Sequence, residues 1–390
     1  MIKTDVDLFK KYFFKKSGNL KLLFAKYDNF QNKIKIFNVV GSNGKGSLSY
    51  FLAKQLELNF KKVGLFTSPA FLYHNERIAI NSKYISDLEL NSYFKKYDCD
   101  FLKYQLNFFE IYTFIAARYF FDSKVDVAVI EAGIGGVKDA TNEFLNQKGV
   151  ILTSVCKDHQ KILGDSIKSI ILNKILIRKN QNTPLFIAQS NIKYQSYFKE
   201  FKNYYLDKKT NLKLNLDLFQ KENVSLAILV CNFFNFRIKN SLFKNLKLKG
   251  RFQKINFLNQ EIILDGGHNI GALKLLIKNL KLLANQEKII ILFATSKTKR
   301  FYKMKTYLKK FYKVYLTQFN HLKAYKVKNY EKTNFVKEKN WGYFLKKNKN
   351  KTIIVCGSIY FISCFYWFLL EYKKKNLKKL KPGFKNEKTL

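Results

Sequence analysis

The sequence predicts an α/β protein with two domains, each built around a parallel sheet, and three observations support this prediction. Short runs rich in β-branched residues alternate with helical patterns along most of the chain, which is typical of βαβ units with both sheet faces covered. The alternation starts again after about residue 245, so we expect one domain at residues 1–246 and a smaller one at residues 247–390. A chain of 390 residues, 47% of them hydrophobic, is long enough for two or three domain cores.

The expected elements follow one another in a regular order. In the first domain we expect strands at residues 34–40, 62–67, 125–130 and 150–153 and helices at residues 48–58, 108–121 and 166–179. In the second domain we expect strands at residues 262–264, 288–293 and 314–316, a helix at residues 270–283, and a closing strand, turn and helix at residues 353–372.

The closing segment has an alternative interpretation. Residues 353–370 carry no charge and lie between lysine-rich runs, so they resemble a membrane-spanning helix. The pair Gly357-Ser358 interrupts the segment and β-branched residues precede it, which favours a strand, a turn and a helix. We therefore expect no membrane partner.

The cysteines and the N-terminus indicate the compartment. Five scattered cysteines form no CxxC pair, which argues against a disulfide framework or a zinc site. The charged N-terminus has no apolar region of the kind found in signal peptides. We expect a cytoplasmic protein with reduced thiols.

The charge balance is strongly basic. The chain has 72 Lys and Arg against 28 Asp and Glu, a formal net charge of +44, and such a balance is typical of proteins that bind an anionic partner. A nucleic-acid-binding protein needs basic residues gathered on one face, with aromatic rings for stacking. Because the lysines are spread along the entire chain, we expect no specific nucleic acid partner and attribute the charge mainly to biased composition.

A glycine-rich loop, GSNGKGS, connects the first expected strand to the first expected helix. Backbone N–H groups of such a loop and the helix N-terminus form a concave anion site. Its lysine can reach the β- and γ-phosphates of a nucleotide, and its serine hydroxyl can bind Mg²⁺. We expect ATP to bind here, with a structural turn as the alternative. The loop consists of Gly41, Ser42, Asn43, Gly44, Lys45, Gly46 and Ser47.

Further segments extend this pattern in order along the chain. They are LFTSP at 65–69, NERI at 75–78, LNFFE at 106–110, VDVAVIEAGIGGVKDATN at 125–142, DH at 158–159, GRF at 250–252, DGGHN at 265–269 and GSIYF at 357–361. Together with GSNGKGS they resemble folylpolyglutamate synthase/dihydrofolate synthase of the Mur-ligase superfamily. The resemblance implies a P-loop-containing Mur-ligase-like ATPase domain with a parallel sheet, followed by a smaller Rossmann-like α/β domain.

The same resemblance implies an ATP-dependent ligase that adds L-glutamate to a folate, to dihydropteroate, or to both. In the family the carboxylate takes the γ-phosphoryl group of ATP, and the glutamate amine then displaces phosphate from the acyl phosphate. The implied partners are these small molecules and Mg²⁺ at two sites, and we expect a monomer.

The resemblance also implies roles for individual residues. The implied catalytic residues are Lys45, Asp265 and His268. The implied nucleotide contacts outside the loop are Asn223, Arg251 and Asp265. The implied metal ligands are Ser47, Ser68, Glu131, His159 and Lys174, the last as a carbamylated side chain because a cationic amine would repel the metal. The implied folate or pteroate contacts are Asn107, Phe108, Phe109, Glu110, Lys138, Asp139 and Ala140.

Several of these residues have simpler explanations. Lys174 is otherwise one more solvent-facing lysine in a lysine-rich protein, and Glu131 is otherwise a strand-end carboxylate. Phe108 and Phe109 are otherwise core aromatics, because an aromatic pair on a helix usually packs inward. A single histidine such as His159 is otherwise structural.

The chain also departs from the family's pattern. Ala70 stands where the family has His, Val137 where it has Arg, Asn173 and Ile175 interrupt EKAGI, and Ile270 replaces Pro. These departures leave the phosphate and metal residues unchanged and fall on the implied substrate side. Two alternatives therefore remain: another amide ligase of the superfamily with a different carboxylate substrate, and, from another class, a basic nucleic-acid-binding protein.

Overall fold

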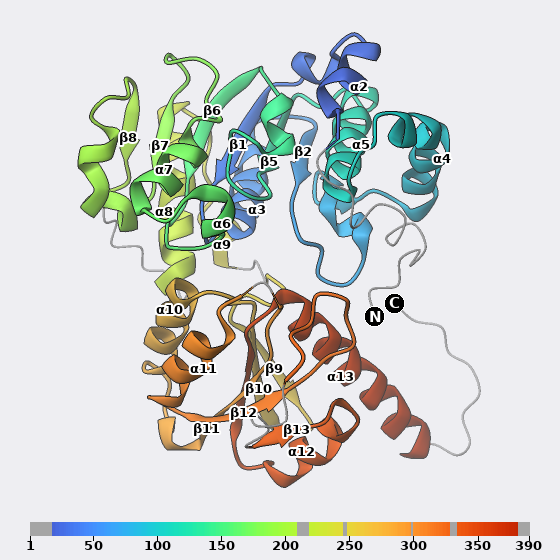
Figure 1. Ribbon diagram of the computed structural model, residues 1–390, viewed down its shortest axis with the longest axis vertical. Coiled ribbons are helices and arrows are strands. Elements are labelled where there is room, and N and C mark those ends of the chain that lie inside the picture. Colours follow the sequence, from blue (N-terminus) through green and yellow to red (C-terminus); the bar gives the residue numbers. More distant parts are fainter. Residues whose placement is uncertain (1–17, 209–217, 245–247, 298, 328–333, 381–390) are drawn as a thin grey trace. The chain divides into compact units, whose positions relative to one another are not determined.

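The computed structural model describes residues 18–208, 218–244, 248–297, 299–327 and 334–380. The chain divides into two compact units, one that ends at Lys247 and one that begins at Leu248. Both units are α/β, as the sequence predicts, and each is described by itself (Figure 1).

The N-terminal unit is built on an eight-stranded sheet in the order β4-β3-β2-β5-β1-β6-β7-β8. From β2 to β8 neighbouring strands are parallel, whereas β3 and β4 form an antiparallel edge. The strands are β1 Ile36–Val40, β2 Val63–Phe66, β3 Ile78–Ile80, β4 Lys83–Tyr84, β5 Val127–Glu131, β6 Gln147–Leu152, β7 Leu185–Ile187 and β8 Tyr204–Leu206.

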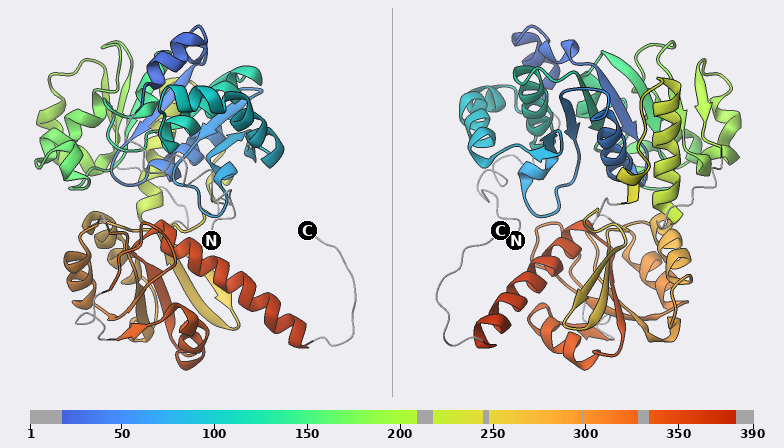
Figure 2. Two further views of the ribbon diagram at one scale, coloured as in Figure 1. Left: turned by 45° about the vertical axis from the view of Figure 1, so that its right-hand side comes forward. Right: turned by 180° about the vertical axis from the view of Figure 1, so that it is seen from behind.

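Helices cover this sheet. They are α2 Leu20–Lys26, α3 Lys45–Leu56, α4 Asp87–Lys103, α5 Phe108–Asp122, α6 Gln160–Leu163, α7 Ile167–Ile175, α8 Leu218–Phe233 and α9 Ser241–Lys244. Helices α3 and α8 lie side by side (Figure 2, right). This pairing places a helix from late in the unit against the helix that follows the glycine-rich loop.

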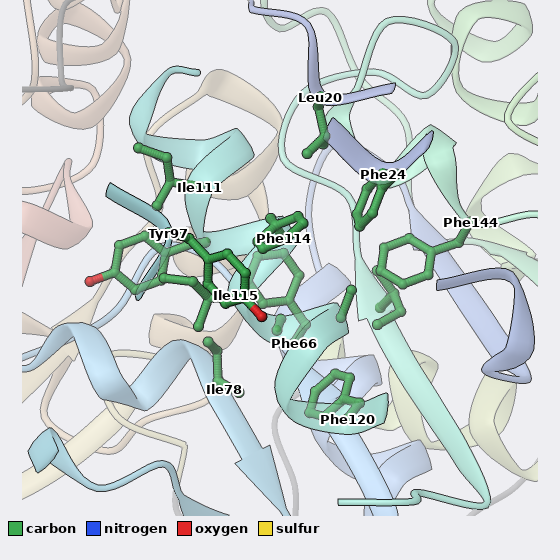
Figure 3. Close-up of a cluster of buried hydrophobic side chains, with 14 of the residues drawn as sticks. Leu20, Phe24, Phe66, Ile78, Tyr97, Ile111, Phe114, Ile115, Phe120 and Phe144 are labelled. Carbon is green, nitrogen blue, oxygen red and sulfur yellow. The ribbon is translucent and has the colours of Figure 1, made fainter. Parts of the chain in front are cut away.

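A cluster of aromatic side chains joins α2, α4 and α5 to the sheet (Figure 3). The ring of Phe114 lies 5.0–5.7 Å, between centroids, from the rings of Phe24, Phe30, Tyr97 and Phe101. Complete burial of one such side chain stabilises a fold by roughly 1.5–3 kcal/mol. The cluster therefore fixes α5, whose first residues were expected to touch substrate.

The C-terminal unit has a six-stranded sheet in the order β13-β12-β11-β14-β10-β9. All neighbours are parallel except β9, which pairs antiparallel with β10. The strands are β9 Gln253–Phe257, β10 Gln260–Asp265, β11 Ile289–Phe293, β12 Lys313–Thr317, β13 Phe335–Val336 and β14 Thr352–Cys356, and the helices are α10 Ile270–Leu280, α11 Phe301–Lys309, α12 Trp341–Lys347 and α13 Ile359–Leu380.

The uncharged segment near the end of the chain is a strand, a turn and a helix, as predicted. Its first residues form β14, the central region turns at Gly357 and Ser358, and α13 follows. Among the described residues, no helix is both long and apolar enough to span a membrane.

The expected helix at residues 166–179 was wrong at its C-terminal end, because α7 stops at Ile175. The chain beyond it is bound by the side-chain amide of Gln147 on β6. Its Nε2 donates to the carbonyl of Ile177 over 2.9 Å, and its Oε1 accepts from the N–H of Lys179 over 2.8 Å. This tertiary contact replaces the helical hydrogen bonds that the local pattern predicts.

Candidate active site

The glycine-rich loop leaves the sheet at the carboxyl end of β1, where open α/β sheets place their binding sites. Gly41 has φ +149°, and a Cβ there would lie 1.9 Å from Oγ1 of Thr153. Only glycine fits this approach. Gly44 occupies the N-cap position with φ 91°, and α3 begins at Lys45, so the first N–H groups of a 12-residue helix point out of the loop.

The segment after β6 holds the loop in place. The N–H of Ser42 donates to the carbonyl of Ser154 over 2.8 Å. The Oγ of Ser42 donates to the carbonyl of Cys156 and accepts from its N–H, both over 3.1 Å, and Nδ2 of Asn43 donates to its Sγ over 3.4 Å. These bonds order the loop and leave the N–H groups at the start of α3 available for an anion.

Two lysines donate to one carbonyl in this loop. The Nζ atoms of Lys45 and Lys174 lie 3.3 and 2.8 Å from the carbonyl oxygen of Gly41. Lys174 is only 3% exposed, so its interpretation as a solvent-facing lysine was wrong. Burial, and secondarily the charge of Lys45, lowers the pKa of Lys174 to about 7. The two amines thus share one acceptor in the loop, and the charge of Lys45 disfavours a second charge on Lys174.

A carboxylate lies on the other side of the loop. Glu131 ends β5 and is 3% exposed, and its Oε2 accepts from the N–H of Ser68 over 2.8 Å. A Cβ at Gly46 would lie 3.3 Å from this Oε2, so the glycine leaves room for the carboxylate at the start of α3. The structure therefore brings Glu131, Ser68 and the loop together.

Ser47 is held by helix α8. Its Oγ accepts from Nε2 of Gln220 over 3.3 Å, and Oε1 of Gln220 accepts from Nδ2 of Asn223 over 3.3 Å. The exposed fractions of these side chains are 2%, 5% and 3%, respectively. Asn223, predicted as a nucleotide contact, is therefore connected through Gln220 to a predicted metal ligand.

His159 lies at the N-cap of α6 with φ 50°. The backbone N–H of His159 donates to Oδ1 of Asp158 over 2.9 Å, and the ring Nε2 of His159 lies 3.9 Å from Oδ2 of the same carboxylate. Asp158 in turn interacts electrostatically with Lys174. Within the described ranges, no group of three or more His, Cys, Asp and Glu side chains is placed to hold a metal ion.

The polar side chains at the start of α5 form hydrogen bonds with the backbone N–H groups of the helix terminus itself. The Oδ1 of Asn107 accepts from the N–H groups of Phe109 and Glu110 over 2.9 and 3.0 Å. The carboxylate of Glu110 accepts from the N–H of Asn107 over 2.8 Å and from that of Gly18 over 2.9 and 3.0 Å. This is a capping box, and it gives both predicted substrate contacts a structural role.

The first two phenylalanines of α5, Phe108 and Phe109, are half-buried against the aromatic cluster. The Phe108 ring lies 5.0 Å from that of His74, and the Phe109 ring lies 5.8 Å from that of Phe66. They are therefore edge residues of the core whose outer faces remain accessible.

Asp139 organises the loop that follows β5. Its carboxylate accepts from the N–H of Ile134 over 2.7 Å and from the N–H and Oγ1 of Thr141 over 3.0 and 2.7 Å. Burial raises the pKa of Asp139 above its ordinary value. Lys138 beside it is exposed and Ala140 is half-buried.

The predicted residues of the C-terminal unit gather where β10 ends. The carboxylate of Asp265 accepts from the N–H groups of Phe252 and Gly267 over 3.0 and 2.8 Å. A Cβ at Gly266 would lie 3.1 Å from Nη1 of Arg251, and Nδ1 of His268 lies 3.1 Å from the Gly266 carbonyl oxygen. Arg251 thus lies beside the segment that holds Asp265 and His268 within this unit.

Comparison with known proteins finds relatives that align over most of the chain, although no family model matches it. The dihydrofolate synthase/folylpolyglutamate synthase of Bacillus subtilis is 28% identical over 404 residues, 89% of this chain and 93% of the relative. The protein of the same name from Buchnera aphidicola subsp. Schizaphis graminum is 28% identical over 305 residues, 72% of each chain. At these identities the chain is similar to proteins named dihydrofolate synthase/folylpolyglutamate synthase over most of its length.

Solved structures of this family share the fold. The structure of E. coli FolC in complex with DHPP and ADP aligns with a TM-score of 0.80 at 20% identity, over 92% of this chain and 94% of that chain. The folylpolyglutamate synthase of Thermotoga maritima aligns with a TM-score of 0.76 at 21% identity, over 94% of this chain and 96% of that chain.

The structure shows the surroundings of two residues that depart from the pattern of the folylpolyglutamate synthase and dihydrofolate synthase family. Val137 is 40% exposed, and its N–H donates to the Asn173 carbonyl over 3.2 Å, so the backbone contact does not depend on the missing arginine. Ala70 is 5% exposed. Both positions are compatible with the fold, and among the described residues neither forms a backbone–backbone hydrogen bond with the glycine-rich loop.

Sequence reasoning assigned no role to Gln220 or Cys156, although both fix the loop or its helix. The signal for Gln220 was present, because Gln220 and Asn223 are three residues apart and share one helix face. Nothing in the sequence pairs Cys156 with the loop, because that contact depends on the parallel pairing of β1 with β6.

Proposed function

We propose that this protein is an ATP-dependent ligase that adds L-glutamate to a tetrahydrofolate, to dihydropteroate, or to both, through an acyl phosphate, and releases ADP and phosphate. The observation that carries the proposal is the loop at residues 41–47 with Glu131 and Ser68 beside it, in a chain that matches named dihydrofolate synthase/folylpolyglutamate synthases over nearly its full length. We propose that it works as a monomer in the cytoplasm.

The residues of the loop fit a nucleotide triphosphate. Its helix N-terminus offers N–H groups, and Lys45 supplies positive charge beside them. Lys45, which also donates to Gly41, is the lysine we assign to the β- and γ-phosphates. Asn223, Arg251 and Asp265 keep their predicted roles toward the base, phosphates and ribose, and His268 its role toward the transferred phosphoryl group.

The residues around Glu131 fit Mg²⁺, which prefers oxygen ligands and usually keeps several waters with one or two protein carboxylates. Glu131 supplies the carboxylate, and the hydroxyls of Ser47 and Ser68 supply neutral oxygens. Because only one of these ligands is a carboxylate, the site does not need a cluster of His, Cys, Asp and Glu side chains, and the described residues form none. When bound, the metal would neutralise charge on the γ-phosphoryl group.

Lys174 and His159 are proposed for a second metal. An amine reacts with CO₂ only as the neutral base: its nitrogen forms a bond to the carbon and loses a proton, which leaves an anionic carbamate. Burial of Lys174 beside the loop, and secondarily the charge of Lys45, favour the neutral amine and outweigh the opposite effect of the Asp158 carboxylate on its pKa. We propose that the carbamate supplies an oxygen ligand that the amine cannot.

We propose a narrower substrate contact than the sequence predicted. The capping interactions of Asn107, Glu110 and Asp139 support roles in shaping the site rather than in touching folate or pteroate. Phe108, Phe109, Lys138 and Ala140 remain the proposed contacts. The half-exposed rings can stack on a planar heterocycle, and Lys138 can attract a carboxylate.

The experiment incubates the protein with Mg-ATP, glutamate and either dihydropteroate or tetrahydrofolate, and mass spectrometry reads the product. We expect one added glutamyl unit with at least one substrate. Lys45→Ala should abolish the product, whereas Lys35→Ala, which removes an exposed lysine just before β1, should retain it. A protein that binds ATP but glutamylates neither substrate would contradict the proposal.

The same experiment tests the related alternative. If phosphate release depends on glutamate and on a different carboxylate, the protein is another amide ligase of the superfamily. The exposed Val137, in place of a cation, is the observation that keeps this alternative open.

A further inference from the structure

Ser47 has a polar partner that the proposed chemistry does not use. Nε2 of Gln220 donates to Oγ of Ser47 over 3.3 Å, and Oε1 of Gln220 accepts from Nδ2 of Asn223 over 3.3 Å. The three side chains, 2–5% exposed, form a chain of hydrogen bonds between α3 and α8 across 173 residues of sequence.

The packing of α3 on α8 does not by itself require an amide side chain at Gln220. Many buried positions of α8 are apolar, including Val224, Ala227 and Val230, and the buried polar residues Asn223 and Ser225 each donate a hydrogen bond. Burial of a side-chain amide costs free energy unless it is hydrogen-bonded. The buried glutamine is therefore explained by the hydrogen bond that its amide donates to the hydroxyl oxygen of Ser47.

A serine hydroxyl has one proton and two lone pairs. When Gln220 donates to one lone pair, the second lone pair and the proton remain for other partners. A cation can take the lone pair, and an anionic oxygen can accept the proton. A fixed donor also selects one side-chain rotamer of Ser47, because a lone pair of its hydroxyl must point toward Nε2 of Gln220.

We propose that Gln220 is a positioning residue that orients the hydroxyl of Ser47 for the metal–nucleotide complex. This inference rests on the proposed function, because it assumes that Mg-nucleotide binds at the loop. Gln220 acts through Ser47 and touches neither nucleotide nor metal. Asn223 completes the arrangement, since its donation to Oε1 of Gln220 fixes which end of the amide faces Ser47.

The chain offers a matched control in Gln55, which lies on the same helix α3 and is also buried. Its Nε2 donates to the carbonyl of Lys239 over 3.1 Å, and its Oε1 accepts from the N–H of Lys239 over 2.9 Å. Gln55 thus makes a long-range amide contact of the same kind, about two helical turns away from Ser47.

The test is calorimetric titration of ADP into the full chain, with Mg²⁺ and with EDTA, for the wild type, Gln220→Met and Gln55→Met. Methionine keeps the volume and removes the hydrogen bonds. We expect Gln220→Met to reduce the Mg²⁺-dependent gain in ADP affinity about tenfold, as for other residues that orient a metal ligand, with little change in EDTA. Gln55→Met should lower the melting temperature and retain the gain.

Each outcome decides the inference. A full Mg²⁺-dependent gain in Gln220→Met, or an equal loss of affinity with and without Mg²⁺, would overturn it. If Gln220→Met does not fold, Gln220→Glu is titrated instead. This variant cannot donate to Ser47, and its retention of the gain would overturn the inference equally. A wild type that binds no ADP in either buffer would instead contradict the proposed function.

Discussion

Lys174 is a buried lysine whose surroundings change its chemistry. Burial and the nearby charge of Lys45 lower its pKa from 10.5 to about 7. The folded protein therefore holds a mostly neutral amine above about pH 7, whereas an exposed lysine becomes neutral only near its ordinary pKa. The same side chain donates to the Gly41 carbonyl, so its chemical state affects the geometry of the loop.

We expect a protein-bound carbamate at Lys174 in neutral buffer. The measurement is ¹³C NMR of the protein in ¹³C-bicarbonate, with Mg-ADP present. One carbamate signal should grow as the pH rises through about 7, because the fraction of neutral amine rises there. Lys174→Ala should remove the signal and Lys35→Ala should not. Absence of any such signal in the wild type would rule out the carbamate.

For single residues, the sequence predicted which residues form the site better than it predicted their burial and contacts. The loop at residues 41–47, Ser68 and Glu131 were found from motif order, and the structure places them together. The burial of Lys174 could not be read from its neighbours, because it depends on the approach of α7 to a loop 133 residues earlier.

Among the elements, helix α5 shows how one carboxylate can secure a helix start. Glu110 is 5% exposed and accepts from the N–H groups of Asn107 and Gly18. Helix α4 has the same device in an exposed form, in which Glu89 accepts from the N–H and Oγ of Ser86. The two boxes differ mainly in burial and in the added contact with Gly18.

We expect Glu110→Ala to lower the free energy of unfolding by about 2 kcal/mol, because loss of a cap exposes N–H donors in a buried setting. Glu89→Ala should cost about 0.5 kcal/mol, since water replaces the lost acceptor there. Urea unfolding of both variants measures the difference. A stable Glu110→Ala protein with a raised KM for the folate substrate would contradict the structural role and restore the predicted substrate contact.

The sequence predicted elements that follow local patterns and missed those set by distant contacts. Strands β1, β5 and β11 and helix α5 appear where periodicity placed them. The short antiparallel edge strands β3, β4 and β9 were also not predicted, although β3–β4 and β9–β10 are hairpins joined by Asn81-Ser82 and Leu258-Asn259. The early end of α7 was missed because a distant contact sets it, in which Gln147 binds the chain beyond the helix.

For the whole molecule, the motifs indicate the fold without use of the charge. The net charge of +44 comes from lysines and arginines distributed along the chain. ATP, glutamate and folates are all anionic, so a positive field favours their capture at low salt, and salt screens it over about 10 Å. The order of motifs predicted an α/β fold in both units. The arrangement of nucleotide residues from both units remains a prediction that follows from the resemblance.

The central claim is that a carboxylate is activated as an acyl phosphate and then joined to glutamate. Its most direct test uses a folate or dihydropteroate substrate with both carboxylate oxygens at the reacting carbon labelled with ¹⁸O, in ordinary water with Mg-ATP and glutamate. One labelled oxygen should leave with phosphate and the other should stay in the new amide, because the amine breaks the bond between carbon and the phosphorylated oxygen. Mass spectrometry of phosphate and product reads both fates. Glutamylated product formed with unlabelled phosphate, or with the label in AMP, would contradict the account.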